Sequence, residues 1–275
     1  MRVLIMASPV APLGSGKTGG VTMHVANTAA ALAASGHEIQ VMAPAGSRLP
    51  GFPLIEIGGT LQPSGASEVG DGHYPVPPDG VLARMWRAAF AEAGTRDVIV
   101  NMAHDWLPYY LTDMAPVPVF HIVNMADVNV AITAEIVRVS EAFPGRVGVM
   151  TDAQAARLGG LPEAARIGFG LDLSVYEPTE TPRGGLVWAG RISPEKGLED
   201  ALAVARALGE RLAIAGAVDN DDYWQGLKTE FAATIDHRGF LATCDLQALM
   251  GQARALLQTQ KWHEAFGIVT VEALA

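Results

Sequence analysis

The chain has 275 residues, of which 49% are hydrophobic and 17% are charged, and its formal net charge is -10. That length suffices for two domains of ordinary size, and the composition excludes extended disorder. A nucleic-acid groove needs clustered Lys and Arg, which a chain of this net negative charge does not favour. We therefore expect no nucleic-acid partner. The one cysteine, Cys244, excludes an internal disulfide and is expected to be a small buried residue in a reducing compartment. No run approaches the roughly 18 apolar residues that span a bilayer, which predicts a cytoplasmic protein without an integral membrane segment.

The first half of the chain alternates apolar runs with helical patterns. Residues 3–6 predict a buried strand, and the Gly-rich loop 12–20, a helix at 21–34 and a strand at 38–42 follow. A strand, a Gly-rich turn, a helix and a second strand form the unit with which doubly wound parallel sheets begin. The pattern continues with a long loop at 58–80, a helix at 81–93 and strands at 97–100 and 117–120.

Proline and charge replace apolar residues at 177–182, which we interpret as a linker. Beyond it the alternation restarts, with strands at 186–189, 212–215, around 235 and at 255–257, and helices at 198–208, near 222, at 246–253 and at 269–275. We therefore predict an α/β protein of two Rossmann-like domains, residues 1–178 and 183–275, on either side of a cleft. Because the last helix runs only a turn or two, we expect the second domain to be incomplete at its C-terminus.

Two acidic residues bracket the predicted turn between the last strand and the last helix. Glu264 lies in the turn, and Glu272 follows eight residues later in the helix. The first amides of that helix attract anionic oxygens, and Gly267 permits a ligand to approach the backbone. Carboxylates on both sides of an anion-binding turn suit a sugar nucleotide. The alternative is an ordinary turn with two solvated glutamates.

A second loop, residues 190–197, places Arg191 and Lys196 between a strand and a helix. Arginine offers a planar fork to phosphate oxygens, and lysine offers a compact charge. The alternative is a solvated turn in which Lys196 pairs with Glu195 or Glu199.

Both segments resemble one family. Glu264-Ala-Phe-Gly-Ile-Val-Thr-Val-Glu272 resembles the E-x7-E motif of retaining GT-B glycosyltransferases of family 4, and residues 190–197 resemble the G-R-x-x-x-x-K-G loop of that family. Within the family, residues 9–20 and the pair Lys261 and Trp262 are similar to those of cyanobacterial-type pteridine (tetrahydrobiopterin) glucosyltransferases. The resemblance runs from residue 19 to residue 272.

The resemblance implies a role for each group. Catalysis is expected of His121 and Glu264. Contacts with the donor diphosphate are expected of Gly19, Gly20, Arg191, Lys196, Gly267, Ile268 and Val269. Contacts with the nucleoside are expected of Glu272, Gly239 and Leu241, and contacts with the acceptor of His104 and Asp105. The resemblance further implies transfer of a hexose, glucose from UDP-glucose, to a small-molecule or glycan hydroxyl, without a metal or another cofactor. It leaves the oligomeric state open.

Other interpretations stay open. Residues 11–18 nearly match a phosphate-binding P-loop, although Gly19 and Gly20 fall where its helix would run, at a cost of roughly 1 kcal/mol each. Asp219 and Asp221 form a D-x-D pattern that suits a divalent cation, but we favour an N-cap of the following helix. A sugar-nucleotide epimerase and a catalytically weak sugar-nucleotide binding protein are further alternatives.

Histidines carry an alternative of their own. A lone histidine at a strand end is more often a hydrogen-bonded structural residue than a catalytic one, which applies to His104 and His121. His24 and His37, on or after the first helix, are expected to serve packing or solvent contacts.

Overall fold

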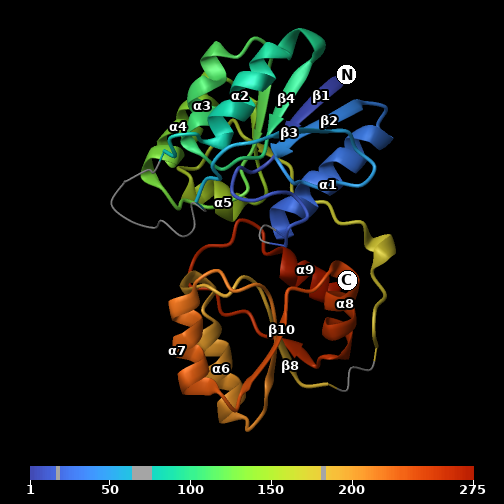
Figure 1. The fold of residues 1–275 in the computed structure, drawn as a ribbon, viewed down its shortest axis with the longest axis vertical. Helices are drawn as coiled ribbons and strands as arrows, with labels where there is room; N and C mark the ends of the chain where they lie inside the picture. The colour runs from blue at the N-terminus through green and yellow to red at the C-terminus, as the bar shows by residue number, and fades with distance from the viewer. Residues whose placement is uncertain (17–18, 64–75, 181–183) are drawn as a thin grey trace. The chain divides into compact units, whose positions relative to one another are not determined.

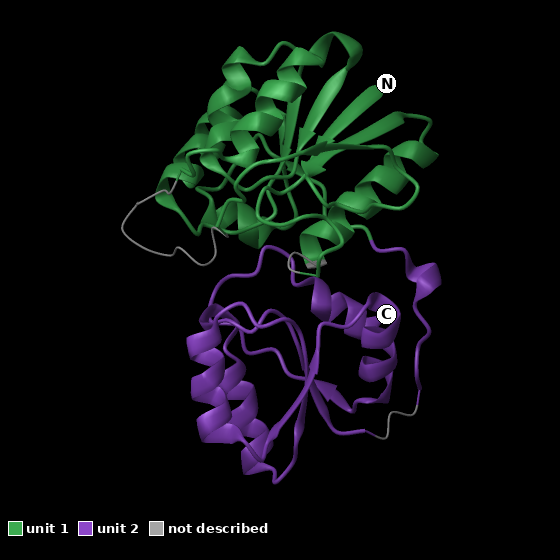
Figure 2. Cartoon of the chain, in the orientation of Figure 1, with its two compact units in different colours: residues 1–170 green, residues 171–275 purple. Residues whose placement is uncertain are grey.

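The computed structural model describes residues 1–16, 19–63, 76–180 and 184–275. These residues form two compact units, Met1–Gly170 and Leu171–Ala275 (Figure 1, Figure 2). Each unit is a parallel α/β sheet, as the sequence predicts. The division falls between Gly170 and Leu171, whereas the predicted first domain extends to residue 178. Residues 171–178 therefore belong to the second unit.

Unit 1 contains a seven-stranded sheet in the order β3-β2-β1-β4-β5-β6-β7, in which every neighbouring pair is parallel. Its strands are β1 (Arg2–Met6), β2 (Glu38–Pro44), β3 (Leu54–Ile57), β4 (Val98–Asn101), β5 (Val119–Ile122), β6 (Val147–Val149) and β7 (Ala165–Arg166). The chain order reverses between β1 and β4. In such sheets ligands bind at the carboxyl ends of the strands beside this reversal.

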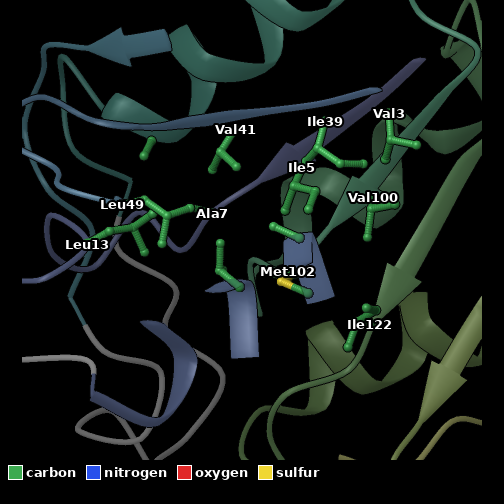
Figure 3. Packing of buried hydrophobic residues seen from close by; sticks show 13 residues of the cluster. Val3, Ile5, Ala7, Leu13, Ile39, Val41, Leu49, Val100, Met102 and Ile122 are labelled. Carbon is green, nitrogen blue, oxygen red and sulfur yellow. The ribbon is translucent and has the colours of Figure 1, made fainter. Parts of the chain in front are cut away.

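The helices of unit 1 are α1 (Gly19–Ala34), α2 (Val81–Ala91), α3 (Trp106–Tyr110), α4 (Val130–Ala142) and α5 (Asp152–Arg157). Strand β1 is buried on both faces, which explains its continuous apolar run. Val3 and Ile5 pack in the cluster of Figure 3, together with Val25 of α1. Leu4 and Met6 point to the opposite face, in the cluster that includes α2. Each such buried side chain stabilises the fold by about 1.5–3 kcal/mol.

Helix α1 begins at Gly19, two residues earlier than predicted. The expectation that Gly19 and Gly20 precede the helix is therefore wrong. Both glycines are in the first turn, where no N–H group has an intrahelical partner. A glycine there therefore destabilises the helix less than a glycine in its interior does. The argument that these glycines oppose a P-loop helix is correspondingly weaker. Residues 17–18 of the P-loop-like stretch, and residues 64–75 of the predicted long loop, lie outside the described residues.

Unit 2 contains a four-stranded parallel sheet in the order β10-β9-β8-β11. Its elements are β8 (Leu186–Ala189), α6 (Leu198–Ala207), β9 (Leu212–Ala215), α7 (Asp221–Phe231), β10 (Ile235–Gly239), α8 (Thr243–Gln252), β11 (Ala255–Leu256) and α9 (Ile268–Leu274). Helices α6 and α7 lie on one face of the sheet, and α8 and α9 lie on the other (Figure 1). Every predicted element of this unit is present. The largest shift is at α8, which begins at residue 243 rather than 246.

Trp188 of β8 packs with Trp224 and Phe231 of α7 in the core of unit 2. Helix α8, in contrast, buries none of its side chains, and Cys244 on it is exposed. The expectation of a buried Cys244 is wrong, because it lies at the exposed start of a helix that has no fully buried side chain. Among the helices that the structure describes, none is long and apolar enough to cross a bilayer.

Candidate functional site

Two loops of unit 2 meet at one edge of its sheet. Strands β8 and β11 pair in parallel, so their carboxyl ends lie side by side. Residues 190–197 after β8 and residues 257–267 after β11 therefore begin at the same end of the sheet. The backbone N–H of Lys261 in the second loop donates to the carbonyl oxygen of Glu195 in the first, at 2.9 Å. The loops that carry the two strongest sequence motifs are therefore in contact.

Gly197 makes this contact possible. Its φ is +64°, and a Cβ built on it would lie 2.0 Å from the carbonyl oxygen of Thr259 in the other loop. Only glycine fits such a position, since both the backbone conformation and the lack of space exclude a side chain. The indole N–H of Trp188 donates to the hydroxyl of the same Thr259 at 3.2 Å. Thr259, which carries no motif, thus ties the second loop to the end of β8.

Lys196 and Glu264, one from each loop, form an ion pair through Nζ and Oε1. Their side chains are 19% and 25% exposed, so the pair is screened by water only in part. The same Oε1 accepts a hydrogen bond from the indole of Trp262 at 2.8 Å, and the Lys196 ammonium lies 4.6 Å from the centroid of that ring. A cation over an indole face is attracted to it. In the part of the chain that the structure describes, Glu264 is the hydrogen-bond partner of Lys196, and an ammonium has two further N–H donors for an anion.

Arg191 is engaged by two carboxylates. Nη1 donates to Asp219 at 2.6 Å, and Nη2 donates to Glu195 at 2.9 Å. The hydroxyl of Ser193 donates to the same Glu195 oxygen at 2.7 Å, which fixes that carboxylate in the loop. A phosphate that binds Arg191 must therefore compete with Asp219, the more exposed of the two acids at 37%.

The D-x-D pattern has a structural explanation. Asp219 pairs with Arg191, and Asp221 is the first residue of α7. Asn220 caps that helix, because its Oδ1 accepts a hydrogen bond from the backbone N–H of Tyr223 at 2.9 Å. The N-cap interpretation is confirmed, with the asparagine as the capping residue. Within residues 1–16, 19–63, 76–180 and 184–275, no group of three or more His, Cys, Asp or Glu is arranged to hold a metal ion.

Glu272 lies in α9 and is 8% exposed. The hydroxyl of Tyr176 donates to its Oε1 at 3.2 Å. Burial raises the pKa of the Glu272 carboxyl, and the hydrogen bond from Tyr176 opposes that rise. Burial and the neighbouring carboxylate raise the pKa of Tyr176 to about 12, so the phenol keeps its proton and donates it. The sequence motif found Glu272 but not Tyr176, which lies 96 residues away along the chain.

The remaining residues predicted around the nucleotide lie at turns of unit 2. Gly267 precedes α9 with φ +81° and ψ +55°, and Ile268 and Val269 form the first turn of that helix. Gly239 ends β10 with φ +69°, and Leu241 follows two residues later. A Cβ at Gly239 would meet no atom within 4 Å, so the backbone is accessible from that side.

His121 of β5 is fully buried in unit 1. The side-chain amide of Asn101 lies 3.2 Å from Nδ1, and the hydroxyl of Thr112 lies 2.9 Å from Nε2. Since the amide nitrogen is a donor, Nδ1 accepts and the ring proton is on Nε2. The ring stacks on Tyr109 with centroids 4.4 Å apart, and burial, helped by the charges of arginines, lowers the pKa of His121 to about 3. Neither ring nitrogen is free for a substrate, which favours the structural alternative.

His104 and Asp105 lie in the loop that follows β4, three and four residues after the strand ends at Asn101. Asp105 caps α3 by accepting the backbone N–H of Leu107 at 3.0 Å, and burial raises the pKa of its carboxyl to about 6. Both ring nitrogens of His104, and the hydroxyl of Tyr109, are buried without a hydrogen-bond partner among the residues described. Burial lowers the pKa of His104 to about 4. Buried polar atoms without partners are costly, so this end of β4 is a place where a polar ligand or water is favourable.

A further polar pair lies in unit 1 after β5. Nδ1 of His24, on α1, is 2.7 Å from the side-chain oxygen of Asn124, and the His24 ring packs on Phe169. Asn124 also donates to the carbonyl oxygen of Met102 at 2.8 Å, which ties the ends of β4 and β5 together. The expected packing role of His24 is confirmed. Asn124 was missed because a single asparagine after a strand carries no motif.

Comparisons with known proteins agree with this arrangement. Residues 180–275 match the family model described as "Glycosyl transferases group 1". Over its full length the chain is 26% identical to glycogen synthase of Mycobacterium tuberculosis and covers 76% of that protein. Among solved structures, AviGT4, a glycosyltransferase involved in avilamycin A biosynthesis, is similar with a TM-score of 0.67 and 22% identity, over 99% of this chain and 75% of that one. Anabaena HepE, in complex with UDP and glucose, gives a TM-score of 0.72 at 18% identity, over 100% and 78% of the two chains.

The chain therefore has the GT-B fold. The family match covers most of unit 2, including the loops that hold Lys196 and Glu264. This match and the curated relative make the chain similar to glycosyltransferases.

Proposed function

We propose that the protein is a retaining glycosyltransferase that transfers glucose from UDP-glucose to a hydroxyl group of a small-molecule or glycan acceptor. The observation that carries the proposal is the contact between Lys196 and Glu264, whose motifs lie 68 residues apart. One motif predicts a diphosphate contact and the other a contact with the donor sugar. A diphosphate sugar needs both kinds of group side by side.

The ion pair suggests how the donor is received. In the free protein, Glu264 neutralises the charge of Lys196. A bound diphosphate offers Lys196 a stronger anionic partner, and the Glu264 carboxylate then accepts hydrogen bonds from the hydroxyls of the sugar. Trp262 contacts both side chains and keeps each in place during this exchange.

Charge separation in the transition state explains the need for cations. As the bond from the anomeric carbon to the diphosphate oxygen lengthens, negative charge grows on the diphosphate and positive charge on the sugar. Lys196, Arg191 and the first amides of α9, after Gly267, stabilise the negative charge, so we propose that no metal or other cofactor is required. The acceptor oxygen forms the new bond on the face that the diphosphate leaves, and its proton passes to the departing phosphate oxygen.

The other parts of both substrates are assigned by the same reasoning. Glu272 accepts the ribose hydroxyls, and the backbone at Gly239 and Leu241 contacts the base. In unit 1, Gly19 and Gly20 lie at the N-terminus of α1, and we propose that their backbone contacts the donor. His104, whose ring nitrogens have no hydrogen-bond partner in the part of the chain that the structure describes, and Asp105, whose carboxylate is buried, contact the acceptor.

The acceptor we propose is a pteridine, on sequence resemblance, with a glycan as the second candidate because of the likeness to glycogen synthase. We place the enzyme in the cytoplasm. For His121 we propose the structural role that its buried, fully hydrogen-bonded ring supports.

A ligand-binding assay tests the proposal. UDP-glucose, GDP-glucose and ADP-glucose are added to the protein and its melting temperature is followed, since a ligand of the native state raises it. We expect UDP-glucose to give the largest shift and Lys196→Ala to weaken its binding by about tenfold or more. Lys228→Ala is the matched control, because Lys228 also lies near a tryptophan of unit 2, 5.9 Å from the Trp224 ring, but away from the two loops.

Two results would contradict the proposal. One is equal donor binding by the wild type and the Lys196→Ala variant. The other is hydrolysis of a nucleoside triphosphate that needs Mg²⁺ and Lys17, which would favour the P-loop interpretation.

A further inference from the structure

Tyr176 stands out among residues that no motif explains. It lies in unit 2, directly after the short 3-10 helix Leu173–Val175, and its side chain is largely buried. Its hydroxyl reaches α9 and donates to Oε1 of Glu272 at 3.2 Å. A segment far from the acidic motif in sequence thus contacts the second glutamate of that motif.

This hydrogen bond has two physical consequences for Glu272. It fixes the carboxylate in one orientation, which a glutamate with three rotatable bonds does not hold by itself. It also stabilises the charged form of the carboxyl, which burial disfavours. Tyr176 uses one acceptor site of Oε1, so Oε2 and the second site of Oε1 can accept hydrogen bonds from a ligand.

We propose that Tyr176 is a positioning residue, which holds the Glu272 carboxylate oriented so that it binds the vicinal hydroxyls of a ribonucleotide. The inference rests on the proposed function, because it takes Glu272 as the ribose contact. It goes further in assigning the discrimination between ribose and deoxyribose to a pair of residues rather than to the glutamate alone. A glutamate without this hydrogen bond would have a higher pKa and a less fixed carboxylate, and its protonated form accepts a hydroxyl donor less well.

The variant Tyr176→Phe isolates the hydroxyl, since phenylalanine keeps the packing of the ring. Its matched control is Tyr223→Phe. Tyr223 is a second partly buried tyrosine of unit 2 whose hydroxyl donates to a glutamate, Glu199. Glu199 pairs with Lys261 of the second loop, but neither Tyr223 nor Glu199 is assigned a contact with the nucleotide. A general effect of losing a tyrosine–glutamate hydrogen bond would appear in both variants.

The experiment measures binding of UDP and of 2′-deoxy-UDP by calorimetry from pH 8 to pH 5, with the full chain. We expect Tyr176→Phe to weaken UDP binding by about fivefold at pH 7 and to change 2′-deoxy-UDP binding less than twofold. The weakening grows as the pH falls. The reason is that loss of the hydrogen bond raises the pKa of Glu272 further, so the variant becomes protonated at a higher pH than the wild type. Tyr223→Phe should bind both nucleotides as the wild type does.

The variant Glu272→Gln, alone and combined with Tyr176→Phe, distinguishes the role of Tyr176 from the ribose contact of Glu272. If Tyr176 acts through Glu272, the double variant binds UDP no more weakly than Glu272→Gln alone. Wild-type affinity of Tyr176→Phe for UDP at every pH, while Glu272→Gln is weakened, overturns the role of Tyr176 and leaves the proposed function standing. Undiminished preference for UDP in Glu272→Gln overturns the nucleoside assignment itself.

Discussion

Replacing Gly197 with alanine tests how the two loops of unit 2 are joined. Two costs add at this position. An alanine at φ +64° costs about 1–2 kcal/mol, because its Cβ approaches the following carbonyl oxygen. The added Cβ also falls 2.0 Å from the carbonyl oxygen of Thr259, a backbone atom that cannot rotate away, and such overpacking costs about 1–3 kcal/mol more. Gly197→Ala should therefore lower the free energy of unfolding by about 2–5 kcal/mol.

Gly209→Ala separates the two costs. Gly209 has φ +69°, but a Cβ there would meet no atom within 4 Å, so only the backbone cost of about 1–2 kcal/mol applies. Urea unfolding followed by tryptophan fluorescence measures both variants. Gly197→Ala should also weaken UDP-glucose binding, because Thr259 and Lys196 must move apart, whereas Gly209→Ala should not. Equal losses of stability in the two variants would refute the close contact between the loops.

Three further predictions concern charge and proton binding. The pKa of His121 falls from 6.5 to about 3 on folding, so its stabilising effect is complete above pH 6.5 and is lost as the pH falls towards 3. Between pH 7 and pH 5 the free energy of unfolding, measured with urea, should fall by about 2 kcal/mol more for the wild type than for His121→Gln. An equal fall in both proteins would contradict the lowered pKa of His121. The pKa of Asp105 rises from 3.8 to about 6, so its effect is complete below pH 3.8 and is lost as the pH rises through 6. Asp105→Asn keeps an N-cap oxygen but cannot ionise. Its free energy of unfolding, relative to that of the wild type, should therefore rise by about 2 kcal/mol from pH 4 to pH 7, and a pH-independent difference would exclude this pKa shift. Glu264→Gln should lower the rate of sugar transfer by about 100-fold while the melting temperature stays close to that of the wild type, and an unchanged rate would remove Glu264 from the site.

Helix α4 shows where the sequence pattern was insufficient. No element was predicted between residues 124 and 176, although α4 spans Val130–Ala142. Its β-branched residues lower helix propensity and resemble a strand. Asn129 caps the helix, with its side-chain oxygen 2.9 Å from the N–H of Ala131, and Ile132, Ile136 and Val139 are buried against the core. Tertiary packing decides such a segment. Strands β6 and β7 were missed for a simpler reason, since two or three residues make no recognisable apolar run.

In the candidate site, too, local sequence predicts the positions of residues but not their tertiary contacts. The positions of Arg191, Lys196 and Glu264 in loops that follow buried strands could be read from the sequence, because apolar runs and glycines determine where strands end. The partners of these residues could not. Lys196 pairs with Glu264 because β8 and β11 are neighbours in the sheet, and Arg191 pairs with Asp219 through the loop that follows β9.

Local sequence determined the two α/β units of this protein, the strands of unit 2 and the motifs at their carboxyl ends. Each of these follows from periodicity, turn residues and capping within a few positions of the chain. Only the tertiary structure decided that Tyr176 holds Glu272, that His24 meets Asn124 and that His121 is sealed in the core. Those contacts join residues far apart in sequence. They form because strand order and helix packing bring distant segments together, and neither of these is written in a local pattern.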